Sequence, residues 1–329
     1  LRYFISTNSA PGLDLRYETE KVESSWNFIN KLWNMSRYTL MTAGDFTKQE
    51  VEALLQDVRR LDFADRWILN KMNDCIQEAD RFFETYDFTE AAKIIYNFAW
   101  NDFAAWYIEI AKLTQTEPKT QAVLLTVLEA ILKLLHPFMP FVTEEIYSSL
   151  PMSTSSIMIA PWPVASQTRF EEAFGKDYFF EMIKAVRQIR NDRNVPYTKK
   201  IDILIRPRDK EIGAFFLENR AIIDKFLNPG QFVVDESFAP DSTMITTIFP
   251  EFTLALPLGS LVDLSEEIAK LEKRCDELAK ELERSEKMLS NPSFVQKAPA
   301  EKVEAEKAKA ADYKIAYEET KARLEELKN

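Results

Sequence analysis

The strongest structural pattern in the sequence is residues 261–290, LVDLSEEIAKLEKRCDELAKELERSEKMLS. Its apolar positions alternate spacings of three and four residues, which is the heptad seam of a coiled coil. Asn291-Pro292 then ends the predicted helix. The seam consists of Leu261, Leu264, Ile268, Leu271, Cys275, Leu278, Leu282, Ser285 and Leu289.

A second helix is predicted after Pro299, with a matching seam. Two helices of similar length around a proline-bearing turn predict an antiparallel coiled-coil hairpin over residues 260–329. At 1.5 Å per residue the hairpin would project roughly 45 Å. Its second seam comprises Val303, Ala310, Tyr317 and Leu324 at one position, and Tyr313, Thr320 and Leu327 at the other.

Residues 1–165 show helical periodicity and few strand signals. The apolar spacing predicts helices over 21–41, 63–83, 88–113, 120–135 and 141–150, with Asp87 as the N-cap of the third. Several long amphipathic helices with short joints predict a helical bundle. Residues 151–168, rich in Ser, Thr and Pro, are expected to form a connector.

Residues 166–259 change from a helical to a strand-like period. A helix is predicted over 170–195 and another over 211–227, with strands at 200–205, 231–234, 244–248 and 252–256. The predicted fold is therefore mainly α with a small α+β module. Its three domains are a helical bundle (1–165), a small mixed α/β domain (166–259) and the C-terminal coiled-coil hairpin (260–329).

Composition excludes several classes of functional site. The six glycines are never closer than seventeen positions, whereas a phosphate-binding loop needs clustered glycines. One histidine and two distant cysteines cannot make a Cys/His zinc site, so no metal is expected. We assign no catalytic residue, because no nucleophile and base set stands out. The start of the sequence does not resemble a signal peptide, and no apolar run reaches eighteen residues, so no membrane contact is expected. The isolated cysteines fit a reducing, cytoplasmic setting.

The first long predicted helix carries the most informative polar face. Val22, Trp26, Ile29, Trp33 and Leu40 are expected to face the core. The opposite side would carry Asn27, Asn30, Lys31, Asn34 and Arg37. Asn amides donate to and accept from base edges, while Lys and Arg reach phosphates, so this face suggests nucleic-acid binding. Phe46, just after the helix, is a candidate for stacking on an unpaired base. The alternative is an ordinary polar helix face.

Two local groups of basic residues stand out in a chain whose formal net charge is −11. Lys184, Arg187, Arg190 and Arg193 recur every three residues and suggest a stripe that follows a phosphate backbone. Lys280, Arg284, Lys287, Lys297 and Lys302 flank the predicted hairpin turn. Pairing with acidic neighbours is the alternative for both groups.

Several motifs resemble class I aminoacyl-tRNA synthetases for aliphatic amino acids. The run 135–145, LHPFMPFVTEE, resembles the helix-end signature of their anticodon-binding domain. Residues 1–16 resemble the segment that follows their catalytic domain, and 26–34, WNFINKLWN, the first anticodon-domain helix. The predicted turn 289–299, LSNPSFVQKAP, is similar to that of the valyl-tRNA synthetase family, which carries a C-terminal coiled-coil arm.

The resemblance implies the C-terminal part of a bacterial-type enzyme that joins valine to tRNA(Val), with ATP and Mg²⁺ used by the parent enzyme and no cofactor in this chain. The catalytic and editing domains would lie elsewhere in the parent chain, so this part alone is expected to be inactive. It implies a cytoplasmic monomer that binds tRNA(Val). The implied anticodon residues are Asn27, Lys31, Asn34, Arg37 and Phe46. The implied outer-corner residues are the five on the predicted hairpin. A protein-binding scaffold without tRNA recognition is the alternative.

Overall fold

The computed structural model describes residues 1–8, 17–166, 168–173, 175–241, 243–261, 264–290 and 300–328. Of residues 172, 264–271, 286, 300–302, 305, 322–323 and 325–328 it describes the backbone alone. The chain forms two compact units, Leu1–Phe179 and Phe180–Asn329. The domain borders expected at 165/166 and 259/260 stay predictions.

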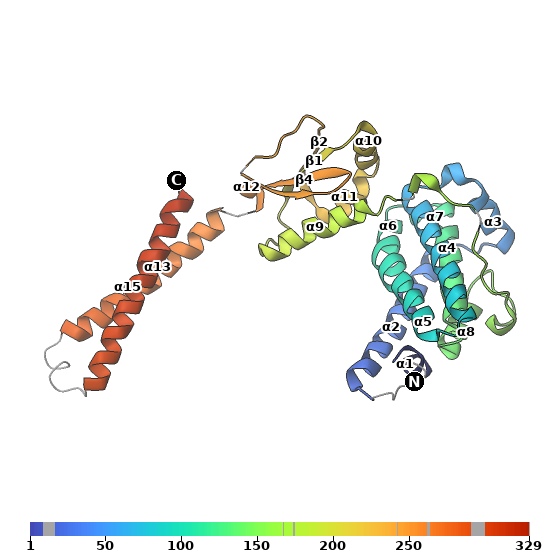
Figure 1. Ribbon diagram of the computed structural model, residues 1–329, viewed down its shortest axis with the longest axis horizontal. Coiled ribbons are helices and arrows are strands. Elements are labelled where there is room, and N and C mark those ends of the chain that lie inside the picture. The colour runs from blue at the N-terminus through green and yellow to red at the C-terminus, as the bar shows by residue number, and fades with distance from the viewer. Residues whose placement is uncertain are drawn as a thin grey trace. The chain divides into compact units, whose positions relative to one another are not determined.

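The first unit is helical (Figure 1). Its α-helices are α1 (Arg2–Asn8), α2 (Thr19–Thr42), α3 (Lys48–Gln56), α4 (Phe63–Glu84), α5 (Phe88–Asn97), α6 (Ile108–Ala111), α7 (Pro118–Leu135) and α8 (Pro140–Ser148). Short helical turns are η1 (Val58–Arg60), η3 (Ile157–Ile159) and η4 (Glu171–Ala173), and η2 (Phe98–Tyr107) is a π-helix.

Helix α7 forms the centre of this unit. Pro118 starts the helix at a position where its missing N–H costs nothing. Its sequence is apolar on nearly every side, as expected of a buried helix, and Leu124, Leu125 and Leu128 are fully buried. Helices α2, α3, α4, α5 and α8 all pack against it.

The core-facing side of α2 differs from the prediction. Trp26 and Trp33 were expected to be buried, but they are 62% and 48% exposed. The buried side chains are instead Phe28, Leu32, Met35, Ser36 and Thr39. Both sets have helical spacing, so periodicity alone cannot choose between them. Tertiary partners make the choice, since the Phe28 ring packs against the rings of Tyr3, Tyr96 and Trp100.

The predicted helix 88–113 is continuous but changes its hydrogen-bonding pattern. It begins as expected, because the Asp87 side chain accepts a hydrogen bond from the Glu90 N–H at 3.2 Å. It runs through α5, η2 and α6, and so contains a π-helical stretch of ten residues. Apolar periodicity does not distinguish that stretch from an α-helix.

The predicted connector 151–168 lies along α4. Trp162 donates to Asp80 Oδ1 at 2.7 Å, and the Ser166 N–H donates to Asn73 Oδ1 at 3.0 Å. Just past this segment, Asn70 both donates to and accepts from the backbone of Phe170. Polar side chains on successive turns of α4 therefore hold this segment in place.

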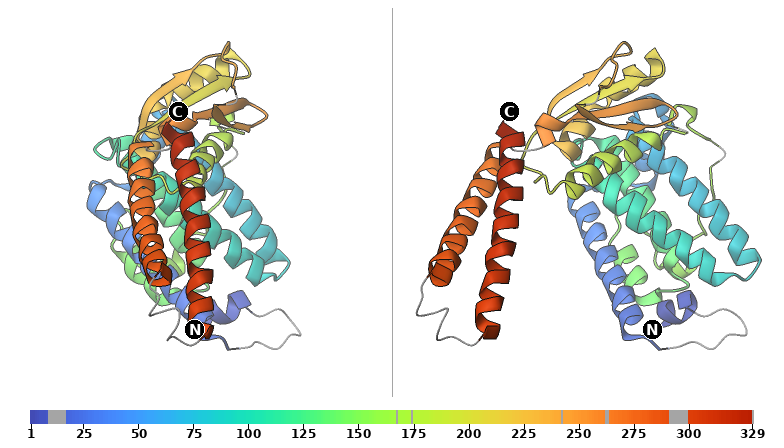
Figure 2. Two further views of the ribbon diagram at one scale, coloured as in Figure 1. Left: turned by 90° about the vertical axis from the view of Figure 1, so that its left-hand side faces the viewer. Right: turned by 60° about the vertical axis from the view of Figure 1, so that its left-hand side comes forward.

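The second unit contains a four-stranded sheet, among the residues that the structure describes, in the order β2-β1-β4-β3. β1 and β2 are parallel, whereas β4 is antiparallel to β1 and β3. Helix α9 runs along one face of the sheet (Figures 1 and 2). The elements are α9 (Tyr178–Asp192), β1 (Ile201–Pro207), α10 (Lys210–Glu218), α11 (Arg220–Leu227), β2 (Pro229–Val234), β3 (Met244–Ile248), β4 (Phe252–Pro257) and α12 (Leu258–Leu261).

The prediction of a mainly helical chain with a small mixed sheet is thus confirmed. Two further long helices, α13 (Leu264–Ser290) and α15 (Ala300–Lys328), lie side by side (Figure 2). Leu278 and Val303 of the predicted seams are buried. Ser285, also on the seam, donates to Glu306 Oε1 at 2.8 Å. The predicted turn lies outside the described residues.

Candidate nucleic-acid interface

The outer face of α2 brings together most of the polar residues predicted for base recognition. Asn27, Asn30, Asn34 and Arg37 are exposed, and Lys31 is half-buried. The Lys31 ammonium lies 5.2 Å from the centre of the Trp100 ring in η2, which fixes the side chain at the edge of this face by a cation–π contact. The face therefore presents amides and cations together.

Helix α2 is also free of acidic side chains over most of its length. No Asp or Glu occurs between Glu23 and Asp45, although the chain has 53 acidic residues among 329. Lys31 and Arg37 lie within this acid-free stretch. A local positive region of this kind can attract phosphate even when the whole protein is acidic. This acid-free stretch is a signal that the sequence itself contains.

Sequence reasoning also missed two aromatic residues on the exposed side of α2. Trp26 and Trp33 were assigned to the core because their spacing is helical. The structure places both indoles in solvent, at the same side of the helix as Asn30 and Arg37. Exposed tryptophans next to amides and cations are typical of surfaces that bind single-stranded nucleic acid.

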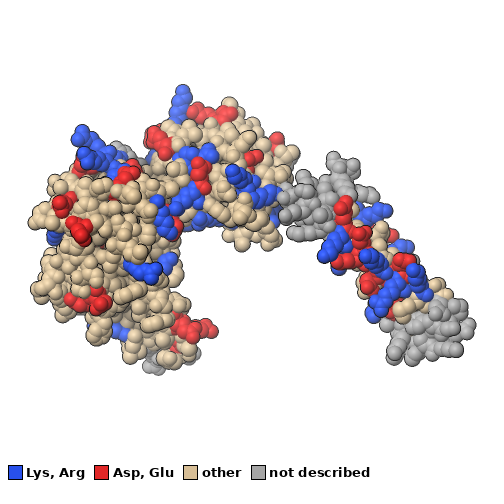
Figure 3. Space-filling view, turned by 180° about the vertical axis from the view of Figure 1, so that it is seen from behind, with Lys and Arg blue, Asp and Glu red and all other residues tan. Residues whose placement is uncertain are grey.

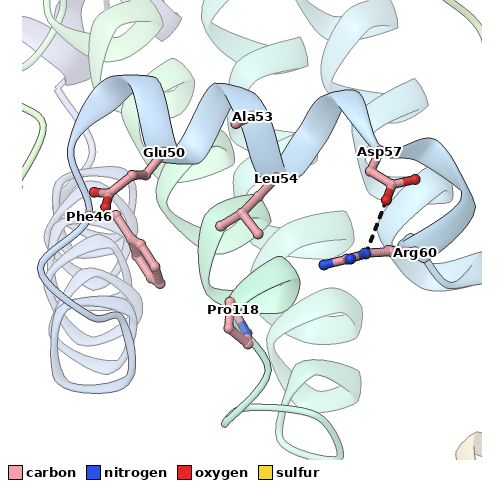
Figure 4. Close-up of a pocket in the computed structure, with 7 residues that line it drawn as sticks. All are labelled: Phe46, Glu50, Ala53, Leu54, Asp57, Arg60 and Pro118. Atoms are coloured by element: carbon pink, nitrogen blue, oxygen red, sulfur yellow. Dashed lines mark ion pairs between the residues drawn. The ribbon is translucent and has the colours of Figure 1, made fainter.

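Phe46 lies apart from these residues in a pocket of its own (Figure 4). The pocket has a volume of about 450 Å³ and lies beside α3, η1 and the start of α7. Arg60 at its edge pairs with Asp57 at 3.0 Å. None of the α2 candidates lines this pocket. It is lined by Phe46, Glu50, Ala53, Leu54, Asp57, Arg60 and Pro118.

The four basic residues predicted as a stripe, three on α9 and Arg193 just after it, have different surroundings. Lys184, Arg187 and Arg193 are exposed. Lys184 pairs with Glu181 at 2.8 Å, and the Arg187 guanidinium lies 5.0 Å from the centre of the Phe226 ring. Arg190 is buried, so it does not lie in the exposed stripe.

Arg190 links separate backbone segments through its hydrogen bonds. Its guanidinium donates to the carbonyl oxygens of Pro196, Lys199 and Leu227, each at 2.9 Å. Helix geometry explains why the surroundings of these basic residues differ. A step of three residues turns a helix by about 300°, so Lys184, Arg187 and Arg190 spread over about 120° of α9. Arg190 is the one of these three that lies in the protein interior.

On α13, the basic candidates Lys280, Arg284 and Lys287 are exposed. Arg284 pairs with Glu281 at 3.5 Å and Lys287 with Glu283 at 2.5 Å. Figure 3 shows both signs of charge interspersed along the described part of α13 and α15. Lys297 lies outside the described residues, as does the side chain of Lys302.

Cys75 and His136 are titratable groups whose pKa values are shifted by burial in the fold. Burial raises the pKa of the Cys75 thiol and lowers the pKa of His136. His136 Nδ1 lies 2.8 Å from Thr143 Oγ1, at the end of α7.

Among the described residues, no group of three or more His, Cys, Asp or Glu side chains is placed to hold a metal ion. In the same residues no helix has both the length and the apolar character needed to cross a membrane.

Two family models match the chain. The model described as the anticodon-binding domain of tRNA ligase matches residues 65–205, which begins after α2. The model described as the valyl tRNA synthetase tRNA binding arm matches residues 263–328, which include α13 and α15.

Similar proteins extend this likeness to the whole chain. Proteins named valine–tRNA ligase from Geobacillus stearothermophilus, Staphylococcus carnosus and Bacillus subtilis are 43%, 41% and 38% identical to it. Each alignment covers 100% of this chain but only 38% of the relative. The chain therefore belongs to the valine–tRNA ligase family and corresponds to the C-terminal part of those proteins, with their anticodon-binding domain and tRNA-binding arm.

Proposed function

We propose that the chain is the tRNA-recognising portion of a valine–tRNA ligase. It would bind tRNA(Val) at the anticodon and at the outer corner, where the D and T loops meet. It would thereby orient the acceptor end for valylation by catalytic and editing domains elsewhere in the parent protein. The observation that carries this proposal is the similarity to valine–tRNA ligases over the entire chain.

The outer face of α2 would read the anticodon. Unpaired bases expose their edges, and the amides of Asn27, Asn30 and Asn34 can both donate to and accept from those edges. Lys31 and Arg37 would neutralise nearby phosphates. The acid-free stretch between Glu23 and Asp45 supports this assignment. Phe46, in its separate pocket, remains a second stacking candidate.

The pair α13 and α15 would form an antiparallel coiled coil that contacts the outer corner of the tRNA. Its support is the burial of Leu278, Ser285 and Val303 on the predicted seams. Lys280, Arg284, Lys287, Lys297 and Lys302 are the proposed contacts there. Lys184, Arg187 and Arg193 would face the backbone between the two ends. This assignment keeps the three-domain division at 165/166 and 259/260.

The contribution of this chain to catalysis would be positional. Binding energy collected far from the reacting end can be used to orient the acceptor end, which raises the rate of the chemical step. ATP and Mg²⁺ would supply activation of valine in the rest of the parent protein. We assign no catalytic residue to this chain, and we propose that the protein acts as a cytoplasmic monomer.

A binding titration tests the proposal. The chain is titrated with tRNA(Val) and with a non-cognate tRNA at several salt concentrations. We expect tighter binding of tRNA(Val), with an affinity that falls as salt rises because counterions are released. Equal affinity for both tRNAs, or binding to proteins alone, would instead favour a scaffold.

A further inference from the structure

Trp26 and Trp33 are large apolar side chains that the fold leaves in solvent. They are 62% and 48% exposed. Neither ring packs on another aromatic ring within the part of the chain that the structure describes. Two exposed indoles on the same side of one helix form a candidate binding surface, because a ligand that covered them would remove a large apolar area from water.

The two indoles are spaced along α2 in a way that suits stacked bases. Residues seven apart in an α-helix are separated by about 10.5 Å along the axis and differ by only about 20° around it. Because helical side chains lean in the same direction, two rings in the same rotamer keep roughly this separation. Stacked nucleotides lie about 3.4 Å apart, so two bases between two rings need about 10.2 Å.

The residues around this space have the chemistry to read bases. Asn30 is exposed and lies between the two tryptophans in sequence, four residues after Trp26 and three before Trp33. Its amide can face the edges of bases held between the rings. Arg37 follows Trp33 by one turn and is also exposed, so it can meet the phosphate that leaves the slot. No acidic residue lies on this part of the helix to repel a phosphate.

We propose that Trp26 and Trp33 are the two walls of a slot that holds two consecutive unpaired bases, with Asn30 at their edges. The inference rests on the proposed function, because the bases belong to the anticodon loop of the bound tRNA. The inference adds Trp26 and Trp33 as specificity-determining residues, although the sequence patterns assigned both to the core. A protein surface as the occupant is the competing outcome of the test.

Fluorescence of 2-aminopurine tests the slot. The probe is an anticodon stem-loop RNA of tRNA(Val) with 2-aminopurine at each loop position in turn. On binding to the unchanged chain, we expect quenching at two adjacent positions, because stacking on an aromatic ring quenches this base. Trp26→Leu and Trp33→Leu should each restore the fluorescence of one of these positions.

Affinity for the unlabelled stem-loop provides the second readout. Base–aromatic stacking contributes about 1–3 kcal/mol per base, so each Leu variant should weaken binding by about fivefold to 150-fold. Trp26→Phe and Trp33→Phe should retain most of the affinity. Phe141→Leu is the matched control, because Phe141 is an 87% exposed aromatic side chain on α8 rather than α2.

The outcomes separate the slot from the proposed function. If the unchanged chain binds the stem-loop selectively but both Leu variants bind as tightly, the slot is wrong and the tryptophans face a protein. Quenching at positions that are not adjacent also overturns it. If the unchanged chain binds a stem-loop of scrambled loop sequence equally well, anticodon reading fails and the slot fails with it.

Discussion

The Tyr107 hydroxyl donates a 2.7 Å hydrogen bond to Asp65 Oδ1 in the interior of the helical unit. Asp65 is 3% exposed and Tyr107 is 1% exposed. The other carboxylate oxygen accepts from the Asp62 N–H at 3.1 Å, as part of the capping box that starts α4. Burial raises the pKa of Asp65, and the Tyr107 hydrogen bond opposes that rise. This pair therefore links the start of α4 to η2 at a cost that depends on pH.

Tyr107→Phe should destabilise the helical unit more at neutral pH than in acid. A raised native pKa means that stability is lost as pH rises from the unfolded value through the native one. Removing the hydroxyl raises the native pKa further and leaves a buried carboxylate short of a donor, so we expect a loss of about 1–3 kcal/mol at pH 7.5. At pH 4 the loss should be smaller.

Urea unfolding followed by tryptophan fluorescence measures this effect. All six tryptophans lie within residues 26–162, so the signal reports on the first unit alone. Tyr17→Phe is the control, because Tyr17 is 71% exposed. An equal loss at both pH values would show that Asp65 is not the group responsible.

Arg190→Met should destabilise the second unit without affecting the first. The carbonyl oxygens of Pro196, Lys199 and Leu227 would lose the guanidinium as donor, and of these Pro196 keeps a second donor in the Lys199 N–H, so we expect a cost of about 3 kcal/mol. Arg190→Lys should recover only part of this, because one ammonium cannot reproduce the planar fork of a guanidinium. Far-UV circular dichroism in urea would follow both units, while fluorescence follows the first.

Arg193→Met is the matched control for Arg190, since Arg193 is an exposed arginine on the turn that follows α9. In this variant the free energy of unfolding of the second unit should change by less than about 0.5 kcal/mol. Similar effects of the two substitutions would contradict a structural role for Arg190.

Lys31→Ala and Arg37→Ala should weaken binding of tRNA(Val) while leaving the bundle folded. Each removes one cation from the outer face of α2, so we expect about a tenfold loss of affinity and a salt dependence that is shallower by about 0.7 per lost contact. Filter binding at several salt concentrations measures both quantities. Lys93→Ala provides the control, because Lys93 is an exposed lysine on α5 that pairs with Glu90. Unchanged affinity in either variant would remove that residue from the site.

Leu278→Asp should separate α13 from α15. Leu278 is buried between these helices, and a buried charge without a partner is strongly unfavourable, so we expect a loss of more than about 3 kcal/mol in this pair. Binding of whole tRNA(Val) should weaken, whereas binding of the isolated anticodon stem-loop should not. Ile315→Asp on α15 is the control, because Ile315 is already 56% exposed. Equal weakening of stem-loop binding would argue against a separate tRNA contact by α13 and α15.

Periodicity predicted the elements better than it predicted their environment. The strands and α7 follow from local patterns, since β-branched runs and an apolar stretch between prolines have few alternatives. The buried side of α2 did not follow, because Phe28 and Trp26 belong to two sets with equally helical spacing. The rings of Tyr3, Tyr96 and Trp100, all distant in sequence, favour burial of Phe28.

The residues of the candidate site were predictable only in part, because their burial depends on tertiary contacts. The amides of α2 were identified by residue type, but the neighbouring tryptophans were assigned to the core on hydrophobicity. The interior position of Arg190 was only partly within reach of the sequence, because a three-residue repeat spreads side chains around a helix but does not show which of them is buried. Its carbonyl partners were not, since Leu227 lies 37 residues away.

Hydroxyl-radical footprinting of tRNA(Val) bound to this chain tests the division of labour most directly. We expect protection of the anticodon loop by the helical unit and of the outer corner by α13 and α15, with the acceptor end left open. Protection confined to the acceptor end, or no protection of either the anticodon loop or the outer corner, would contradict the account.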